Sequence, residues 1–260
     1  MSIITVSYNA ERFISESLKS VCCQGVDVEH LIIDGASSDN TLEIVGKYPH
    51  VAHVVSEPDR GVYDAMNKGL ALATGDVVGI LNADDYYADD SVLKRVCSLF
   101  ENPNIDACYG DLVYIQDGRE SILRDNNKNI SDPKKIVRYW ESGPFSRRKF
   151  YWGWMPPHPT FFVRREIYEE FGKFDLSFGT ASDYELMLRF LLKYGIRCEY
   201  IPEILVDMRV GGVSNVSFKN RLNAHMMDRE AWRVNGLKPY PWTLSLKPLR
   251  KIPQWWRRPS

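Results

Sequence analysis

Short apolar runs alternate with amphipathic stretches through the first half of the chain. β-Branched and aliphatic residues form runs of strand length at residues 2–7, 29–34, 51–56, 76–81 and 107–115. Apolar residues recur at helical spacing in residues 11–23, 39–47, 61–73 and 92–100. Strands that alternate with helices of this length predict an α/β fold, with a mostly parallel sheet covered by helices on both faces.

The second half has a different pattern. Residues 116–157 are polar, aromatic and rich in turn-forming residues, which predicts long loops. A strand at residues 160–165, an amphipathic helix at 182–194 and an extended segment at 198–208 follow. Residues 232–260 contain seven Lys or Arg and no Asp or Glu, interleaved with Trp232, Trp242, Trp255 and Trp256. Such a mixture suits a membrane interface, where amphipathic rings and basic groups both find partners.

Composition narrows the classes of protein to consider. The chain has 260 residues, 44% hydrophobic and 26% charged, and a net charge of −1, which argues against general attraction to nucleic acid. No apolar run is long enough to cross a bilayer, and no basic leader precedes the first apolar segment, so we expect no secretory signal. Five cysteines without a C-x-x-C spacing predict reduced, mostly buried thiols in a cytosolic protein.

The most informative polar cluster follows the fourth predicted strand. Ligands bind beyond the carboxyl ends of strands in parallel sheets, and the run Asn82-Ala83-Asp84-Asp85 lies at such an end. Two adjacent carboxylates repel each other there, and a hard divalent cation such as Mg²⁺ would remove the repulsion. A solvated turn before a helix is the alternative, because Asp is common in turns and at helix starts.

Other strand ends carry further candidates. Asp34 can accept a hydrogen bond from a base or a ribose hydroxyl, or it can close a tight turn with nearby serines. Asp59 can bind a sugar hydroxyl, and Arg60 or Lys68 can bind a phosphate. Lys68 can equally form a surface pair with Asp64 at i,i+4 spacing.

Two candidates lie in the second half. Asp183 is in the first turn of a predicted helix, where the helix dipole favours a carboxylate that can act as a general base. The alternative is an ordinary N-terminal helix charge. His158, in PPHPTFF, can contact a phosphate, a metal or an acceptor, although a lone histidine is more often structural.

Several motifs occur together in one order. TVSYNAE, LIIDGASSDNT, SEPDRGVYDAMNKGLALATGDVVGILNADD, HPTFFVRR, FDLSFGTASDYELMLR and MRVGGVS together resemble a bacterial family 2 glycosyltransferase of the GT-A fold. The resemblance covers residues 2–215, and residues 56–85 are its most specific part. The set is similar to enzymes that build O-antigen, capsule or exopolysaccharide.

The resemblance implies inverting transfer of a sugar from a nucleotide-sugar donor, with UDP the expected nucleotide and Mn²⁺ or Mg²⁺ the expected cofactor. It places Asp85 on the metal, Asp84 on the ribose or sugar and beside the metal, and Asp183 as the catalytic base. Asn82 departs from the simplest Asp-x-Asp form of the motif. The residues implied for the donor are Thr5, Val6, Tyr8, Asn9 and Asp34 around the base, and Asp59, Asn67 and Lys68 nearby.

The resemblance also implies that successive segments of the chain have different roles. Residues 1–115 would bind the nucleotide sugar, residues 116–215 the acceptor and the base, and residues 216–260 would form an amphipathic extension. Aromatic loops that include Trp154 would shape the acceptor cleft, with His158 and Arg60 as further contacts to acceptor or phosphate. The expected acceptor is a glycan on a polyprenyl diphosphate.

The expected location is therefore cytoplasmic, with the tail on the inner face of the cell membrane. Packing of the tail's tryptophans on the enzyme or on a second subunit is the alternative. A sugar nucleotidyltransferase would need a Gly-rich phosphate loop, which residues 2–25 lack. A non-catalytic nucleotide-sugar-binding protein would not need Asp84, Asp85 and Asp183 together.

Overall fold

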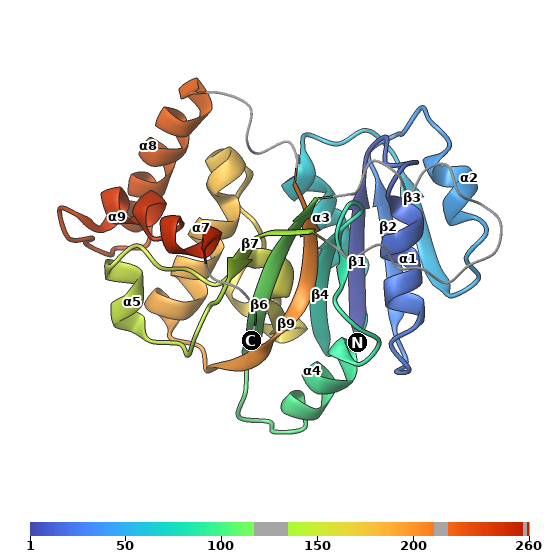
Figure 1. The fold of residues 1–260 in the computed structure, drawn as a ribbon, viewed down its shortest axis with the longest axis horizontal. Helices are drawn as coiled ribbons and strands as arrows, with labels where there is room; N and C mark the ends of the chain where they lie inside the picture. Colours follow the sequence, from blue (N-terminus) through green and yellow to red (C-terminus); the bar gives the residue numbers. More distant parts are fainter. Residues whose placement is uncertain (117–134, 211–217, 257–258, 260) are drawn as a thin grey trace.

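The computed structural model describes residues 1–116, 135–210, 218–256 and 259. One sheet runs through the molecule in the order β3-β2-β1-β4-β8-β6-β9-β5, with β7 paired to β6 (Figure 1). The strands are β1 (Ser2–Ser7), β2 (Glu29–Asp34), β3 (Val51–Ser56), β4 (Val77–Asn82), β5 (Tyr86–Tyr87), β6 (Ala107–Gln116), β7 (Lys135–Trp140), β8 (Phe162–Arg164) and β9 (Cys198–Arg209). The α-helices are α1 (Ile14–Cys22), α2 (Thr41–Val45), α3 (Val62–Leu72), α4 (Val92–Phe100), α5 (Arg147–Tyr151), α6 (Arg165–Phe171), α7 (Ser182–Met187), α8 (Phe218–Val234) and α9 (Thr243–Leu249).

The predicted mostly parallel sheet is confirmed. β1 pairs in parallel with both β2 and β4, and β2 pairs in parallel with β3. β8 is antiparallel to both β4 and β6, and β6 is parallel to β9. β6 and β9 therefore run in the same direction as β4, so the carboxyl ends of all six of these parallel strands lie at one edge of the sheet.

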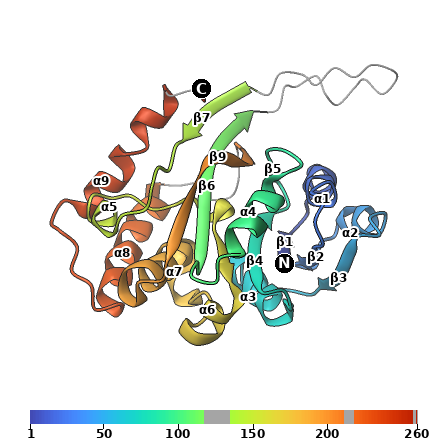
Figure 2. The ribbon, with the colours of Figure 1, turned by 90° about the horizontal axis from the view of Figure 1, so that it is seen from below.

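Helices cover both faces of this sheet, as the alternating pattern predicted. Figure 2 shows α1, α2 and α4 on one side and α3, α6 and α7 on the other. Successive side chains of β1 point to opposite faces of the sheet, because Ile3 packs with residues of α4 and Ile4 with residues of α3. A Cβ on Gly69 of α3 would lie only 2.4 Å from Ile4 Cγ2. Glycine therefore lets α3 approach β1 closely.

The second half contains more regular structure than its composition suggested. Residues 116–157 were expected to include long loops; residues 117–134 lie outside the described residues, and β7 and α5 lie in the rest of this range. β7 was not predicted, and its backbone pairs with β6. The helix predicted at residues 182–194 is present as α7 followed by a π-helical stretch, η3 (Leu188–Tyr194). Gly195 ends it in the left-handed conformation, with φ of 68°.

The C-terminal segment packs on the second half of the molecule. Trp232 is fully buried, and its indole Nε1 donates a hydrogen bond to the Tyr184 hydroxyl at 2.9 Å. The expectation of an interfacial ring is therefore wrong for Trp232, because the core of the second half encloses it. Trp242, Trp255 and Trp256 are exposed. After α9 the chain forms a 3₁₀ turn, η5 (Ile252–Trp255), which packs against β7.

Two simpler expectations are also tested. All five cysteines are free, but Cys22 and Cys23 are exposed and Cys108 is the one that is fully buried, so the prediction of mostly buried thiols was wrong. Across the described ranges, none of the helices combines the length and the apolarity needed to cross a membrane.

Candidate active site

Two acids lie at the mouth of β4, where the sequence placed them. The chain turns sharply after Asn82, whose carbonyl accepts a hydrogen bond from the backbone N–H of Asp85 at 3.0 Å. The Asn82 Nδ2 also donates to Asp85 Oδ2 at 2.9 Å. Asp85 is fully buried, and its Oδ1 has no hydrogen-bond partner among the residues that the structure describes. Burial, and then repulsion by Asp84, raises the pKa of Asp85 to about 8.

Arg209 braces this turn from the end of β9. Its guanidinium is almost fully buried, and Nη1 donates to the backbone carbonyl of Asp84 at 2.9 Å. The same guanidinium pairs with Glu16 of α1 and lies over the rings of Phe13 and Tyr86. Arg209 favours the ionised form of Asp85, but its effect does not outweigh burial. The turn is thus held by three elements, with one buried carboxylate oxygen left to bind something else.

These groups fit a hard divalent cation. Mg²⁺ is commonly held by one or two carboxylates together with substrate phosphates, and Asp84 and Asp85 supply the two carboxylates. In the described part of the chain, no group of three or more His, Cys, Asp or Glu side chains lies close enough to hold a metal by itself. Any further ligands would have to come from the substrate or from water.

The residues predicted around a base lie at the neighbouring ends of β1 and β2. The ring of Tyr8 is 67% exposed and available for stacking. Thr5 and Val6 are buried, and Thr5 Oγ1 is 2.9 Å from His30 Nε2. The Thr5 side chain is therefore occupied within the protein, and only its backbone is left to contact a base. Asn9 has a positive φ of 47°, and its side-chain oxygen accepts from the Ser38 N–H at 2.9 Å. The side chain of Asn9 thereby orders the loop after β2.

Asp34 is buried and fully hydrogen-bonded. Its carboxylate accepts from Ser7 Oγ at 3.0 Å, from the Ser37 N–H at 2.8 Å and from Ser56 Oγ at 2.7 Å. These are the contacts of the tight-turn alternative. A base that reached Asp34 would have to replace one of the serine hydroxyls with its own N–H group.

Asp59 is drawn to this edge by a close approach at Gly35. A Cβ on Gly35 would lie 2.6 Å from Asp59 Oδ2 and 3.4 Å from the Tyr8 ring. Asp59 Oδ1 accepts from the Gly61 N–H at 2.8 Å, which fixes the start of α3. Gly35 therefore allows Tyr8 and Asp59 to lie side by side.

The other predicted donor contacts already have partners in the protein. The exposed guanidinium of Arg60 pairs with Asp64 at 3.0 Å. Lys68 Nζ lies 2.9 Å from a carboxylate oxygen of Glu57, so the alternative of a surface ion pair holds with a different acid. The amide of Asn67 exchanges two hydrogen bonds, of 2.9 and 3.0 Å, with the backbone of Phe174. Asn67 thus joins α3 to the segment that leads to Asp183.

Asp183 begins α7 and lies among aromatic and polar groups. Its Oδ1 accepts from the Tyr184 N–H at 2.7 Å. The Tyr63 hydroxyl donates a hydrogen bond to the Asp183 carboxylate. Burial, and then the charge of Asp183, raises the pKa of Tyr63. Burial lowers the pKa of His158, and Asp183 opposes that effect. The predicted base, Tyr63 and His158 therefore share one site.

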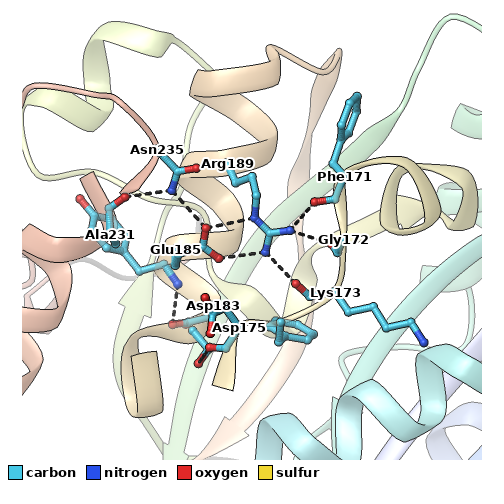
Figure 3. Close-up of polar contacts among 12 residues, drawn as sticks. Phe171, Gly172, Lys173, Asp175, Asp183, Glu185, Arg189, Ala231 and Asn235 are labelled. Atoms are coloured by element: carbon cyan, nitrogen blue, oxygen red, sulfur yellow. Dashed lines mark hydrogen bonds and ion pairs between the residues drawn. The ribbon is translucent and has the colours of Figure 1, made fainter. Parts of the chain in front are cut away.

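A buried polar cluster anchors the helix that carries Asp183 (Figure 3). Arg189 pairs with Glu185 at 2.8 Å and donates to the backbone carbonyls of Gly172 at 2.9 Å and Lys173 at 2.7 Å. Asn235 of the C-terminal segment donates to Glu185 at 3.1 Å. The cluster fixes the start of α7 relative to the loop after α6.

Tyr114 of β6 links the two acidic centres. Its pKa is raised first by burial, and the charges of Asp85 and Asp183 raise it further, whereas Arg138 opposes the increase. Acids from opposite halves of the sequence therefore both act on the pKa of this one hydroxyl. Sequence reasoning missed Tyr63, Tyr114 and Arg209 as neighbours of these acids, and Arg138 as the neighbour of Tyr114. Tyr63 and Arg209 had a signal, because Tyr63 lies in the SEPDRGVYDAMNKG run and Arg209 in the MRVGGVS motif.

Trp154 has a different environment from the one expected. It is 5% exposed, packs against Tyr109 and Phe150, and donates from Nε1 to the Ser142 carbonyl at 2.9 Å. The adjacent Trp152 is exposed. Trp154 thus contributes to the core beneath the second half, and Trp152 presents its ring at the surface.

Comparisons with known proteins extend these observations. The family model "Glycosyl transferase family 2" matches residues 2–172. A Mycobacterium tuberculosis protein named as an uncharacterized glycosyltransferase is 33% identical over 194 residues, which are 73% of this chain and 68% of that protein.

Solved structures share the fold at low sequence identity. S. aureus TarS 1–349 in complex with UDP-GlcNAc has a TM-score of 0.64 at 17% identity, over 98% of this chain and 78% of that one. The chain spans 38% of a longer TarS chain. The mannosyltransferase PcManGT from Pyrobaculum calidifontis, in complex with GDP-Man and Mn²⁺, has a TM-score of 0.63 at 19% identity, over 95% of this chain and 68% of that one.

Proposed function

This chain belongs to glycosyl transferase family 2 and has the GT-A fold, and on that premise we propose that it transfers a sugar from a UDP-linked donor to a glycan acceptor with inversion. The single observation that carries the proposal is the fully buried carboxylate of Asp85 at the mouth of β4, whose Oδ1 has no hydrogen-bond partner among the described residues. A donor site at the mouth of β4 and a base at the start of α7 then flank one reaction space.

Asp183 acts as the general base in this proposal. It takes the proton from the acceptor hydroxyl as that oxygen attacks the anomeric carbon from the face opposite the leaving group. Help of this kind contributes about 10²–10⁴-fold to the rate. The hydrogen bonds around Glu185 and Arg189 hold the start of α7, and so the carboxylate of Asp183, in place.

The first half of the chain binds the donor in this proposal. The exposed ring of Tyr8 stacks on the base, and Asp34 and Asp59 accept hydrogen bonds from the nucleoside. Mn²⁺ or Mg²⁺ held by Asp85 with Asp84 would supply positive charge where the leaving nucleoside diphosphate gains negative charge. Comparison structures with UDP-GlcNAc, and with GDP-Man and Mn²⁺, support a nucleotide-sugar donor.

The acceptor we propose is a glycan on a polyprenyl diphosphate, in the synthesis of a surface polysaccharide such as O-antigen or capsule. The exposed side chains of Trp242, Ile252, Trp255 and Trp256, close to basic residues, support a C-terminal segment that rests on the inner face of the cell membrane. This surface would bring the enzyme to a lipid-linked acceptor.

The experiment is a donor panel followed by one substitution. Purified protein with Mn²⁺ is incubated with UDP- and GDP-sugars, and released nucleoside diphosphate is measured. Addition of hexose or N-acetylhexosamine to lipid-linked acceptors is followed by mass spectrometry. We expect one donor to be preferred, and Asp183→Asn to lower turnover by about 10²–10⁴-fold while nucleotide affinity is kept. Equal turnover of the two proteins would remove Asp183 from its assigned role.

A further inference from the structure

Arg138 is a buried cation near the proposed reaction space. It lies on β7 and is 9% exposed. Its Nε donates to Gln254 Oε1 at 2.6 Å, and its guanidinium lies 4.3 Å from the centre of the Tyr114 ring and 5.4 Å from that of Trp140. These contacts hold the plane of the guanidinium in one orientation. Its Nη2 is buried and has no hydrogen-bond partner among the described residues.

No carboxylate of the described ranges forms an ion pair with Arg138. Burial lowers the pKa of Arg138, and only the Tyr114 hydroxyl opposes that effect. A buried charge without a partner of opposite sign is costly, and proteins seldom keep one unless a ligand completes it. Arg209, the other buried guanidinium near these acids, differs because Glu16 pairs with it. Among the described residues, no anion therefore completes the arrangement around Arg138.

The strand register places Arg138 beside Tyr114 and leads from Tyr114 toward the turn that holds Asp85. Arg138 is directly opposite Tyr114 in the antiparallel β6–β7 pair, so their side chains lie on the same face of the sheet. Tyr114 in turn is opposite Met208 of β9, and the preceding residue, Asp207, pairs with Tyr86, which follows Asp85. The Tyr114 hydroxyl is influenced by Asp85 and by Asp183. The guanidinium of Arg138 thus lies against the side chain on which both acids act.

We propose that Arg138 binds a phosphate group in the space between Asp85 and Asp183, and that Gln254 of the C-terminal segment positions it. This inference rests on the proposed function and adds a specific residue to it. A planar guanidinium fixed at Nε presents its remaining N–H groups to phosphate oxygens. Two substrates can supply that phosphate, namely the diphosphate of the donor and the diphosphate of a lipid-linked acceptor.

The test compares the affinities of matched variants by titration calorimetry. Arg138→Met removes the donors and keeps much of the volume, and Arg148→Met makes the same change on the exposed surface of α5. The probes are UDP with Mn²⁺ for the donor, uridine as its phosphate-free counterpart, and farnesyl diphosphate for the acceptor. We expect Arg138→Met to lower the affinity for UDP or for farnesyl diphosphate by about 10- to 100-fold. The affinity for uridine should not change, and Arg148→Met should bind all three probes as wild type does.

The probe whose affinity falls in Arg138→Met identifies the substrate that supplies the phosphate. Equal affinities of wild type and Arg138→Met for both UDP and farnesyl diphosphate would overturn the inference. A wild-type protein that binds neither UDP nor uridine would instead contradict the proposed function. The two failures are therefore distinguishable.

Thermal unfolding separates a ligand-binding role from a structural one. If Arg138 is kept for a ligand, Arg138→Met will leave the Tm of the free protein unchanged or higher, because an unpaired buried charge is removed. A large fall in Tm with unchanged diphosphate affinity would show a purely structural residue. Gln254→Ala should lower the affinity for the same probe as Arg138→Met, but by a smaller factor, because it removes only the hydrogen bond that Gln254 accepts from Arg138 Nε.

Discussion

At the scale of single residues, the buried carboxylate of Asp85 is the most costly group in the proposed site. Its ordinary pKa is 3.8, and burial and Asp84 raise it to about 8. Between these values the folded protein keeps a proton that the unfolded chain has lost. The free energy of unfolding therefore falls as pH rises from about 4 to 8, in the absence of metal.

Asp85→Asn tests this cost directly. The amide cannot ionise, so we expect the metal-free variant to have a higher Tm than wild type at pH 8, and little difference at pH 4. A gain of 1 kcal/mol corresponds to about 2–4 °C in a protein of this size class. Differential scanning calorimetry with a chelator present measures both proteins across this range.

The same substitution should remove the stabilisation that Mn²⁺ gives. The Tm of wild type should rise on addition of Mn²⁺ and UDP, and the Tm of Asp85→Asn should rise much less. Asp90→Asn is the matched control, since Asp90 is exposed near the same turn. A Tm of Asp85→Asn below that of wild type at pH 8 without metal would mean that the carboxylate stabilises the fold.

The sequence was informative about single residues wherever a motif surrounded them. Asp84, Asp85 and Asp183 were singled out from their places at a strand end and a helix start, and the charges of Asp85 and Asp183 both raise the pKa of Tyr114. Tyr114 and Arg138 could not be found in this way. Each is one residue of an ordinary strand, and its importance comes from the pairing of β6 with β7, which no local pattern encodes.

At the scale of elements, the buried Glu185–Arg189 pair holds the base-bearing helix in place. The two side chains are 4% and 12% exposed, and Arg189 also satisfies backbone carbonyls of the loop after α6. Removing one partner of a buried ion pair leaves the other uncompensated. We therefore expect Arg189→Met to lower the free energy of unfolding by about 3–5 kcal/mol, measured by urea denaturation.

An exposed pair on α8 provides the control. Arg233 pairs with Glu230 on the surface, so Arg233→Met should leave the denaturation midpoint unchanged. If the two arginine variants were equally stable, the cluster in Figure 3 would not anchor α7.

Element prediction succeeded where periodicity was strong. β1, β2, β3 and α4 have the bounds that their apolar spacing predicted. β7 was missed because its sequence, KIVRYW, follows a polar region and carries two cations, and a strand of this kind is stable only through its partner. The π-helical stretch η3 has the same apolar stripe as an α-helix, so spacing could not distinguish the two.

At the scale of the whole molecule, one sheet joins the proposed donor and acceptor halves. β8 lies between β4 and β6 and connects the two parallel sets of strands. The sequence predicted the mostly parallel sheet but not this antiparallel insertion, because strand order depends on which edges meet in the folded chain. Residues 216–260 were expected to form an amphipathic extension on the membrane, with packing on the enzyme as the alternative. The C-terminal segment packs through Trp232 on Tyr184 and through Gln254 on Arg138.

This packing changes how the membrane proposal is tested. Deletion of residues 242–260 would remove Gln254 as well as the exposed rings, so point substitutions are cleaner. We expect Trp255→Ser with Trp256→Ser to shift the protein from membrane to soluble fraction, because exposed rings supply interfacial affinity. Flotation with vesicles of anionic lipid measures the change.

Val54→Ser is the control for that experiment. Val54 is an exposed apolar residue on the edge strand β3, in the other half of the molecule. If both variants float as wild type does, the exposed tryptophans do not serve as a membrane contact.

The central claim is that a cation joins the acids after β4 to the diphosphate of a sugar donor. An anomalous difference map from crystals grown with Mn²⁺ and UDP tests it most directly. The account predicts one strong manganese peak at the Asp85 carboxylate, with the UDP phosphates beside it and the base against Tyr8. Ordered UDP at another place, or manganese bound away from Asp85, would contradict the account.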